Sequence, residues 1–407
     1  MFFNVVEPTI AQSLLAERLP RILPSESIPL EQALDRLCSE TITAPHSLPF
    51  FRRSTMDGYA VRAVDTHGAS ESLPTLLTVR GEVLMGQPTA IKLSVGETAV
   101  IHTGGELPPD ADAVVRVEDT RQIMLDEVEV NQSVSSGENV IQVGEDIEKG
   151  QTVLEAGHQL RPQDLGGLAA LGIQQLRVVR KPSVAIISTG DELVPYDQIP
   201  RPGQVRDINS LTLASMVTKV GAEPIAKGII PDDLDLLSAV IGDSVEEADI
   251  VVISAGSSVS VRDATLKAMQ RIPGCDVLFH GVAVKPGKPT VGAIANGRPV
   301  IGLPGNPVSA MNLFALLVIP TIKHLMGAKS VEKATVSASL ARNVASAPGR
   351  EDYISVRLES RDGEIWAEPV FGKSNLIYTL IHADGTIVIP ADKSGLTRGE
   401  FVSVSLF

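Results

Sequence analysis

Small, polar and charged residues recur at the predicted ends of five strands in the second half of the chain. These segments are Ser188–Glu192, Pro231–Asp233, Ser254–Asp263, Lys285–Pro289 and Gly302–Ser309. Ligands of an open α/β sheet bind at the carboxyl ends of its strands, so these residues are candidates for one site. Glycine- and serine-rich turns that open a helix present backbone N–H groups to an anion. The pattern therefore predicts that the site binds a phosphate or another oxyanion.

The charged residues of these segments suggest the same chemistry. Lys285 and Lys288 supply two cations on one Pro/Gly turn, and Asp232 and Asp263 could share a divalent ion such as Mg²⁺. Each feature also has a simpler structural interpretation, as a helix-capping carboxylate, a plain turn or a solvated loop. There is no Walker A pattern, no G-x-G-x-x-G and no histidine pair at zinc-ligand spacing.

The elements that would position these residues alternate between strands and helices from Lys181 onward. We expect strands at 184–187, 224–230, 250–253 and 277–284, a hairpin at 290–301, and helices at 209–220, 233–246, 263–271 and 307–326. Asn209 is expected to cap the first of these helices. Such alternation, with apolar strands buried on both faces, predicts a doubly wound α/β domain.

The remaining segments predict attachments to this domain. Leucines at helical spacing predict two helices within 7–36, and a further helix is expected at 162–172. Short Val/Ile/Thr-rich segments separated by turns predict a mainly β region, at 58–64, 76–84, 97–103 and 112–118. Five more short strands between 334 and 406 predict a small β-barrel or sandwich.

The composition excludes several classes of protein. The 407 residues carry a formal net charge of −14, which argues against general binding to nucleic acid or to an anionic membrane. The length predicts about two to four domains. Two cysteines, no signal peptide and no run of 18 apolar residues predict a soluble, cytoplasmic protein without a disulfide framework.

Six motifs in chain order resemble one family. They are the runs Ser54–Val61 (STMDGYAV), Thr103-Gly104 before Pro108-Pro109, Gly144–Asp146, Ser188–Leu193 (STGDEL), Lys285–Pro289 (KPGKP) and Leu303–Ser309 (LPGNPVS). The chain resembles the molybdopterin molybdenumtransferase family, which is related to the E domain of gephyrin. Weaker matches at Pro348–Arg350 and Gly372–Ser374 extend the resemblance over nearly the whole chain.

The resemblance implies four structural parts in an elongated homodimer. They are a helical, dimerising segment (1–45 plus 150–180), a β-rich insertion (46–149), an α/β molybdopterin-binding domain (181–328) and a C-terminal β-barrel (329–407). In the family the cleft forms between the α/β domain of one subunit and the insertion of the other. The implied reaction converts adenylylated molybdopterin and molybdate into molybdenum cofactor and AMP, with Mg²⁺ as cofactor. Contacts with the adenylyltransferase and with apo-molybdoenzymes are also implied.

The same resemblance assigns roles residue by residue. The residues implied in catalysis are Asp57, Thr103, Asp146 and Glu192, and those implied in metal binding are Asp232 and Asp263. The implied substrate-binding residues are Ser188, Gly190, Asp191, Gly256, Ser257, Ser258, Lys285, Lys288, Pro304, Gly305, Asn306, Pro307, Ser309, Arg350 and Ser374.

The segment 254–263 departs from the family pattern S-G-G-V-S-x-G-x-x-D. A glycine of the pattern is lost, Ser257 and Ser258 follow Gly256, and Arg262 stands beside Asp263. Two alternatives therefore stay open. One is adenylylation of molybdopterin, whose enzyme shares the α/β domain. The other is a non-catalytic scaffold that binds the cofactor.

Overall fold

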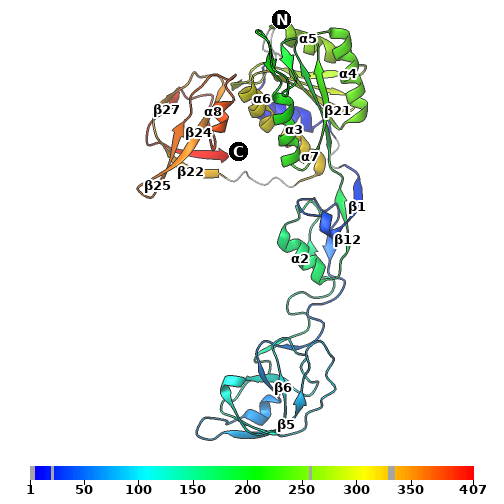
Figure 1. Ribbon diagram of the computed structural model, residues 1–407, viewed down its shortest axis with the longest axis vertical. Helices are drawn as coiled ribbons and strands as arrows, with labels where there is room; N and C mark the ends of the chain where they lie inside the picture. Colours follow the sequence, from blue (N-terminus) through cyan, green and yellow to red (C-terminus); the bar gives the residue numbers. More distant parts are fainter. Residues whose placement is uncertain (1–4, 20–22, 256–258, 329–334) are drawn as a thin grey trace. The chain divides into compact units, whose positions relative to one another are not determined.

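The protein contains two compact units (Figure 1). The computed structural model describes residues 5–19, 23–255, 259–328 and 335–407. Unit 1 contains the chain up to Ser39, Gly157–Arg161 and Gln175–Phe407, and unit 2 contains Glu40–Ala156 and Pro162–Gln174. The finer division into four parts stays a prediction.

A six-stranded sheet in the order β16-β13-β17-β21-β20-β18 forms the centre of the α/β domain in unit 1. Its strands are β13 (Ser183–Thr189), β16 (Glu223–Ile230), β17 (Ile250–Ala255), β18 (Asp276–His280), β20 (Val291–Ala295) and β21 (Arg298–Pro304). The first four strands in the order run parallel, and β20 is antiparallel to both of its neighbours. Every side chain of β17 is buried, as expected for a strand covered on both faces.

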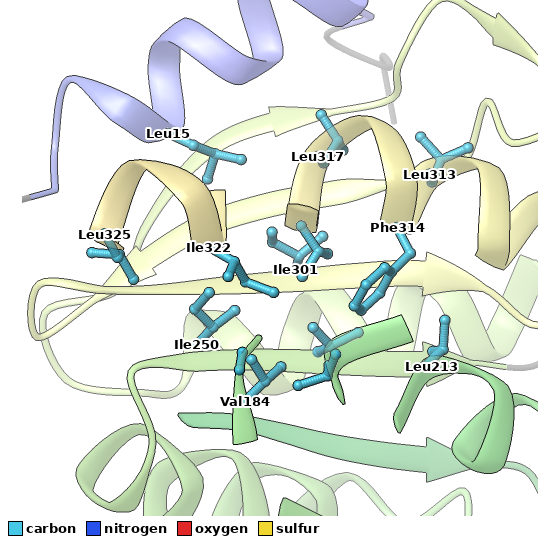
Figure 2. Close-up of a cluster of buried hydrophobic side chains, with 14 of the residues drawn as sticks. Leu15, Val184, Leu213, Ile250, Ile301, Leu313, Phe314, Leu317, Ile322 and Leu325 are labelled. Atoms are coloured by element: carbon cyan, nitrogen blue, oxygen red, sulfur yellow. The ribbon is translucent and has the colours of Figure 1, made fainter. Parts of the chain in front are cut away.

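Helices cover both faces of this sheet, which confirms the predicted doubly wound domain. They are α1 (Pro8–Ala16), α3 (Asn209–Lys219), α4 (Leu234–Glu247), α5 (Val259–Gln270), α6 (Pro307–Leu313), the π-helical turn η4 (Phe314–Val318) and α7 (Ile319–Met326). Side chains of α1, α3 and α6–α7 share one core with the sheet. Figure 2 shows Leu15 of α1 and Phe314 of η4 in this cluster, above Val184 and Ile250. A second core on the opposite face contains side chains of α4 and α5.

The continuous helical segment Pro307–Met326 is the main apolar element of the first core. Its 20 residues and mean hydropathy of 1.5 qualify it as a candidate membrane span, contrary to the prediction from the sequence. However, 61% of its apolar window is buried inside the protein. Packing against the sheet and α1 therefore accounts for its apolar composition.

Pro320 explains why this segment contains a π-helical turn. Proline lacks the N–H that would bond the carbonyl four residues earlier, and its ring crowds that carbonyl. In this helix the carbonyl belongs to Leu316, and it accepts a hydrogen bond from Nε2 of Gln12 at 2.7 Å instead. The first helix of the chain thus provides the donor that the last helix of the domain lacks.

Unit 2 is mainly β, as predicted. Its six-stranded sheet contains, in spatial order, β7 (Ala113–Arg116), β4 (Gly58–Val61), β6 (Glu97–Ile101), β5 (Thr75–Glu82), β9 (Glu127–Val130) and β8 (Thr120–Met124). Smaller elements are the pairs β2 (Ile42–Thr43) with β11 (Thr152–Leu154) and β3 (Arg53–Ser54) with β10 (Val140–Ile141), and helix α2 (Pro162–Ala170). Two apolar clusters form its core.

The C-terminal region is a closed β-barrel, which the sequence also predicted. Its five strands are β22 (Thr335–Leu340), β24 (Glu351–Arg361), β25 (Glu364–Pro369), β26 (Gly385–Ile389) and β28 (Phe401–Leu406). The barrel closes because β24 pairs with both β25 and β26. The short helix α8 (Tyr378–Ile381) and the pair β23 (Val344–Ala345) and β27 (Gly395–Leu396) complete the region.

Three predictions of local structure were wrong. The second helix predicted within 7–36 is instead strand β1 (Ser25–Pro29) followed by a 3-10 turn, because β12 (Gln175–Val179) pairs with β1 along its whole length. The strand predicted at 277–284 ends at His280, and β19 (Val284–Lys285) is separate. Asn209 does not cap α3, since the N–H of Ser210 is bonded by the Asp207 carboxylate.

Asp249 joins three segments at the end of the sheet opposite the predicted site. Its side chain is 3% exposed and accepts hydrogen bonds from both terminal nitrogens of Arg180 at 2.8 and 2.9 Å, from Arg298 at 2.6 Å and from Ser183. Burial alone would raise the pKa of Asp249, but the bonds from Arg180 and Ser183 outweigh burial and lower the pKa to about 2.

We expect Asp249→Asn to lower the free energy of unfolding by about 2–4 kcal/mol at neutral pH. The pKa in the folded state lies below the ordinary 3.8, so the carboxylate contributes its full stability above about pH 4 and loses it as the pH falls towards 2. Urea titrations of both proteins between pH 2 and 7 measure this difference. A difference that stays constant down to pH 2 would show that ionisation of Asp249 contributes nothing.

Candidate active site

A cavity of about 230 Å³ in unit 1 collects seven of the predicted substrate-binding residues. The predicted residues in its wall are Lys285, Lys288, Pro304, Asn306, Ser309, Arg350 and Ser374. Pro286, Gly287 and Pro289 complete the lining. The α/β domain supplies most of these residues, and the C-terminal region supplies Arg350 and Ser374.

Backbone packing brings the lysine turn against the helix that carries Ser309. The Lys285–Pro286 peptide bond is cis, and Gly287 follows with a φ of +125°. A Cβ at Gly287 would lie 2.0 Å from Cδ2 of Leu313, so only glycine allows this approach to α6. The turn that carries Lys285 and Lys288 is therefore packed against α6 in the wall of the cavity.

Pairing of β19 with β24 places Arg350 beside Lys285. The two strands are parallel, with Val284 opposite Glu351 and Lys285 opposite Asp352. The N–H of Glu351 donates to the carbonyl of Ala283 at 3.0 Å. Arg350, which precedes β24 directly, is thus held at the edge of the cavity by backbone hydrogen bonds.

The cavity carries an excess of positive charge. Nζ of Lys285 lies 2.7 Å from Oδ2 of Asp352, which is 2% exposed and also accepts a bond from Ser346 at 2.9 Å. Arg350 has no ion-pair partner among the residues that the structure describes. The wall of the cavity thus carries three cationic side chains, and Lys285 is the one held against a buried carboxylate. Such side chains suit a small oxyanion.

Two hydrogen bonds connect the loop after β21 to Ser374. Nδ2 of Asn306 donates to Oγ of Ser374 at 3.0 Å, and the N–H of Val308 donates to the Ser374 carbonyl at 3.1 Å. Gly305 is partly buried, whereas Pro304 and Pro307 are buried. The loop therefore has a fixed position against the C-terminal region.

The ends of β13 and β16 bring four more predicted residues together: Gly190, Asp191, Glu192 and Asp232. Oγ1 of Thr189 donates to Oδ1 of Asp232 at 3.0 Å, and the N–H of Asp232 donates to Oδ1 of Asp191 at 3.1 Å. Gly190 lies against Glu192, because a Cβ at Gly190 would be 2.6 Å from Oε2 of that residue. Asp191 and Asp232 are exposed, so their remaining oxygens can meet a ligand.

Other predicted residues have different surroundings. Ser188 is fully buried, and its hydroxyl bonds that of Ser210 at 2.8 Å. Gly256, Ser257 and Ser258 lie outside the described residues, and so does the side chain of Asp263.

The oxygen ligands at this edge are compatible with magnesium. No group of three or more His, Cys, Asp or Glu side chains that could hold a metal occurs among the described residues. Magnesium uses one or two protein carboxylates and completes its coordination with water and substrate phosphates. The carboxylates of Asp191 and Asp232 are consistent with that kind of site.

In unit 2 the predicted residues Asp57 and Thr103 are in direct contact. Oδ1 of Asp57 accepts the N–H of Thr103 at 2.7 Å and its hydroxyl at 3.1 Å. Nδ1 of His102 lies 3.8 Å from the same oxygen, while Nε2 of His102 lies 2.8 Å from Glu82. The Thr103 backbone and hydroxyl bonds, with a smaller effect of His102, lower the pKa of Asp57 below its ordinary value. Asp57 is therefore an exposed carboxylate that stays ionised.

Asp146 lies elsewhere in unit 2. It is exposed, and its N–H donates to the carbonyl of Leu48 at 3.1 Å. The structure records no contact between the described side chains of Asp146 and Asp57.

Family models match three consecutive stretches of the chain. Their descriptions are the MoeA N-terminal region (domain I and II) over residues 6–172, a probable molybdopterin binding domain over 185–324, and the MoeA C-terminal region (domain IV) over 337–407. The chain belongs to the MoeA family.

Relatives match over nearly their full length. The chain is 34% identical to the molybdopterin molybdenumtransferase of Haemophilus influenzae over 403 residues, which cover 98% of this chain and 97% of the relative. It is 30% identical to the molybdopterin molybdenumtransferase of Staphylococcus aureus, with 94% and 91% covered. A crystal structure of the molybdopterin biosynthesis MoeA protein from Pyrococcus horikoshii superimposes with a TM-score of 0.86 at 32% identity and covers 99% of this chain and 100% of that chain.

Membership of the MoeA family confirms the resemblance inferred from the motifs. Several residues of this site were not predicted from the sequence. Asp352 pairs with Lys285 across a strand pairing that joins positions 67 residues apart. Thr189 bonds Asp232. It lies inside the STGDEL motif, directly before Gly190, and this position could have identified it as a site residue. His102 precedes the Thr103-Gly104 motif, and its contacts with Asp57 and Glu82 depend on a sheet that no motif reveals.

We expect Thr103→Val to raise the pKa of Asp57 towards its ordinary value, because the valine removes the hydroxyl donor and keeps the backbone N–H. Carboxyl-carbon NMR shifts recorded against pH measure the change. His67→Gln is the matched control, since His67 is another exposed residue of unit 2 that makes no contact with Asp57. An unchanged titration of Asp57 in the threonine variant would show that the hydroxyl bond is not formed in solution.

Proposed function

We propose that the chain is a molybdopterin molybdenumtransferase, which inserts molybdate into adenylylated molybdopterin and releases AMP in molybdenum cofactor biosynthesis. The cavity lined by Lys285, Lys288 and Arg350, in a chain of the MoeA family, is the observation that carries this proposal. The names of the relatives in Haemophilus influenzae and Staphylococcus aureus support it.

Molybdate is the substrate proposed for this cavity. It is a tetrahedral dianion, so it requires two compensating charges and donors from several directions. Lys285, Lys288 and Arg350 provide the charge, while Ser309 and Ser374 provide hydroxyl groups. A volume of about 230 Å³ admits a small oxyanion with ordered water.

The adenylylated pterin is proposed to bind along the ends of β13, β16 and β17. Gly190 follows β13 and the segment Gly256–Ser258 follows β17 by sequence, and such glycine-bearing turns at strand ends are typical of phosphate sites. Asp232 and Asp263 would hold Mg²⁺, which neutralises phosphate charge when bound. Glu192 is positioned beside Gly190, where its carboxylate can orient water near a bound phosphate.

The residues of unit 2 are proposed to act from a second subunit. Asp57, Thr103 and Asp146 are exposed, as a cleft completed by another copy of the chain would require. In such a homodimer, Thr103 keeps Asp57 ionised and fixes its orientation. The carboxylate of Asp57 can then accept a proton from a group at the reacting centre.

Adenylylation of molybdopterin is the alternative reaction for the α/β domain alone. The anion cavity favours insertion, because Arg350 and Ser374 belong to the C-terminal region. The proposal includes a cytoplasmic location, contacts with the adenylyltransferase and with apo-molybdoenzymes, and no role in binding nucleic acid or membranes.

Formation of molybdenum cofactor from adenylylated molybdopterin and low molybdate, followed by pterin fluorescence, tests the proposed function. We expect the wild-type protein to form the cofactor and to release AMP. Glu192→Gln and Asp57→Ala should each lower the rate by at least about 100-fold while the dimer stays folded. Consumption of ATP and free molybdopterin by the wild type would support adenylylation instead. Bound pterin without any product would support the scaffold.

We expect Arg350→Ala to raise the molybdate concentration for half-maximal rate by about tenfold or more, because it removes a cation of the cavity wall that has no ion-pair partner among the described residues. Arg350→Lys should give an intermediate value, since a lysine keeps the charge without the planar guanidinium. Arg357→Ala is the matched control, because Arg357 lies on β24, the strand that directly follows Arg350, and is paired with Glu359 at the surface. Equal effects of the two alanine variants would remove Arg350 from the molybdate site.

A further inference from the structure

The side-chain amide of Asn209 joins the end of strand β17 to the loop after β21. Asn209 is 8% exposed, and its Nδ2 donates to Oγ of Ser254 at 2.7 Å and to the carbonyl oxygen of Gly305 at 2.8 Å. An amide nitrogen has two hydrogens, so these bonds use both of its donors. The position of Asn209 is therefore fixed by both partners.

These partners belong to different parts of the site. Ser254 is the penultimate residue of strand β17, two positions before the segment Gly256–Ser258 that is proposed to bind the pterin phosphate. Gly305 follows β21 and precedes Asn306, whose side chain reaches Ser374 across the anion cavity. One buried amide thus lies between the phosphate edge and the wall of the cavity.

Asn209 is not needed to hold its own helix. The start of α3 is fixed by Asp207, which bonds both the N–H and the hydroxyl of Ser210, and Ser210 bonds Ser188 of β13. No side-chain capping bond comes from Asn209. Its polar group therefore acts on the neighbouring loops.

We infer that Asn209 is a positioning residue for molybdate: its amide holds the Gly305 carbonyl and so keeps Asn306 and Pro304 in place as a wall of the anion cavity. The inference rests on the proposed function, since it assigns molybdate to that cavity. Loss of the donor would leave the Gly305 carbonyl without its partner, and the loop would move to reach water.

Asn209→Asp tests the inference, because aspartate has nearly the same shape but donates no hydrogen bond when ionised. At about pH 8 we expect molybdate to bind the variant about tenfold more weakly than the wild type. At about pH 6 the difference should shrink, since a buried carboxyl beside a carbonyl oxygen has a raised pKa and donates one bond once protonated. Calorimetric titration with molybdate alone measures this without turnover.

Two further variants separate positioning from general destabilisation. Asn209→Ala should weaken molybdate binding by about tenfold at both pH values, because alanine cannot recover a donor. Ser244→Ala removes another buried hydrogen bond of the same domain, from a hydroxyl to Val240, and should leave molybdate affinity within about twofold. If Asn209→Asp does not fold, the molybdate affinities of Asn209→Ala and Ser244→Ala are compared instead.

The inference and the proposed function fail in different ways. Wild-type affinity for molybdate in both Asn209 variants, or equal weakening of the Asp variant at both pH values, would overturn the inference. A wild-type protein that forms no cofactor, together with pH-dependent weakening in Asn209→Asp, would overturn the proposed function and support the positioning role in an anion site.

Discussion

The anion cavity depends on holding three cations close together against their mutual repulsion. Backbone contacts hold them in place, because β19 pairs with β24 and Gly287 packs against Leu313. Asp352 reduces the repulsion from a buried position under Lys285. A lone surface cluster of the same three side chains would spread into solvent, whereas here the strand pairing and the loop bonds to Ser374 keep the charges facing one space.

Much of this arrangement could be predicted because strand ends are visible in the sequence. Continuous apolar runs identified β13 and β17, and the rule that ligands bind at carboxyl ends of parallel strands directed attention to the loops after them. The lysine turn and the loop Leu303–Ser309 were recognisable from their fixed glycines and prolines. Arg350 and Ser374 came from the family resemblance, since nothing near them in the sequence suggests an anion.

The parts that could not be predicted depend on partners far away in the chain. Leucine spacing at 30–37 resembles a helix, yet the pairing of β1 with β12, about 150 residues later, overrides that local preference. Asn209 stands at the start of an apolar helix and so resembles a cap, but its amide bonds a strand end and a loop that come 45 and 96 residues later. Likewise, the overall charge of −14 gave no sign of a local excess of positive charge, because most of the acidic side chains lie elsewhere on the surface.

The bond between Gln12 and the Leu316 carbonyl spans 304 positions of the chain and has a consequence for the order of folding. Helix α1 is synthesised before the α/β domain, and the sheet face and the π-helical turn that receive it are completed only when that domain has been synthesised. Until then Leu15 and its neighbours in α1 remain without their core. The N-terminal helix is therefore among the last elements to dock, and the α/β domain closes only when both ends of that long segment are present.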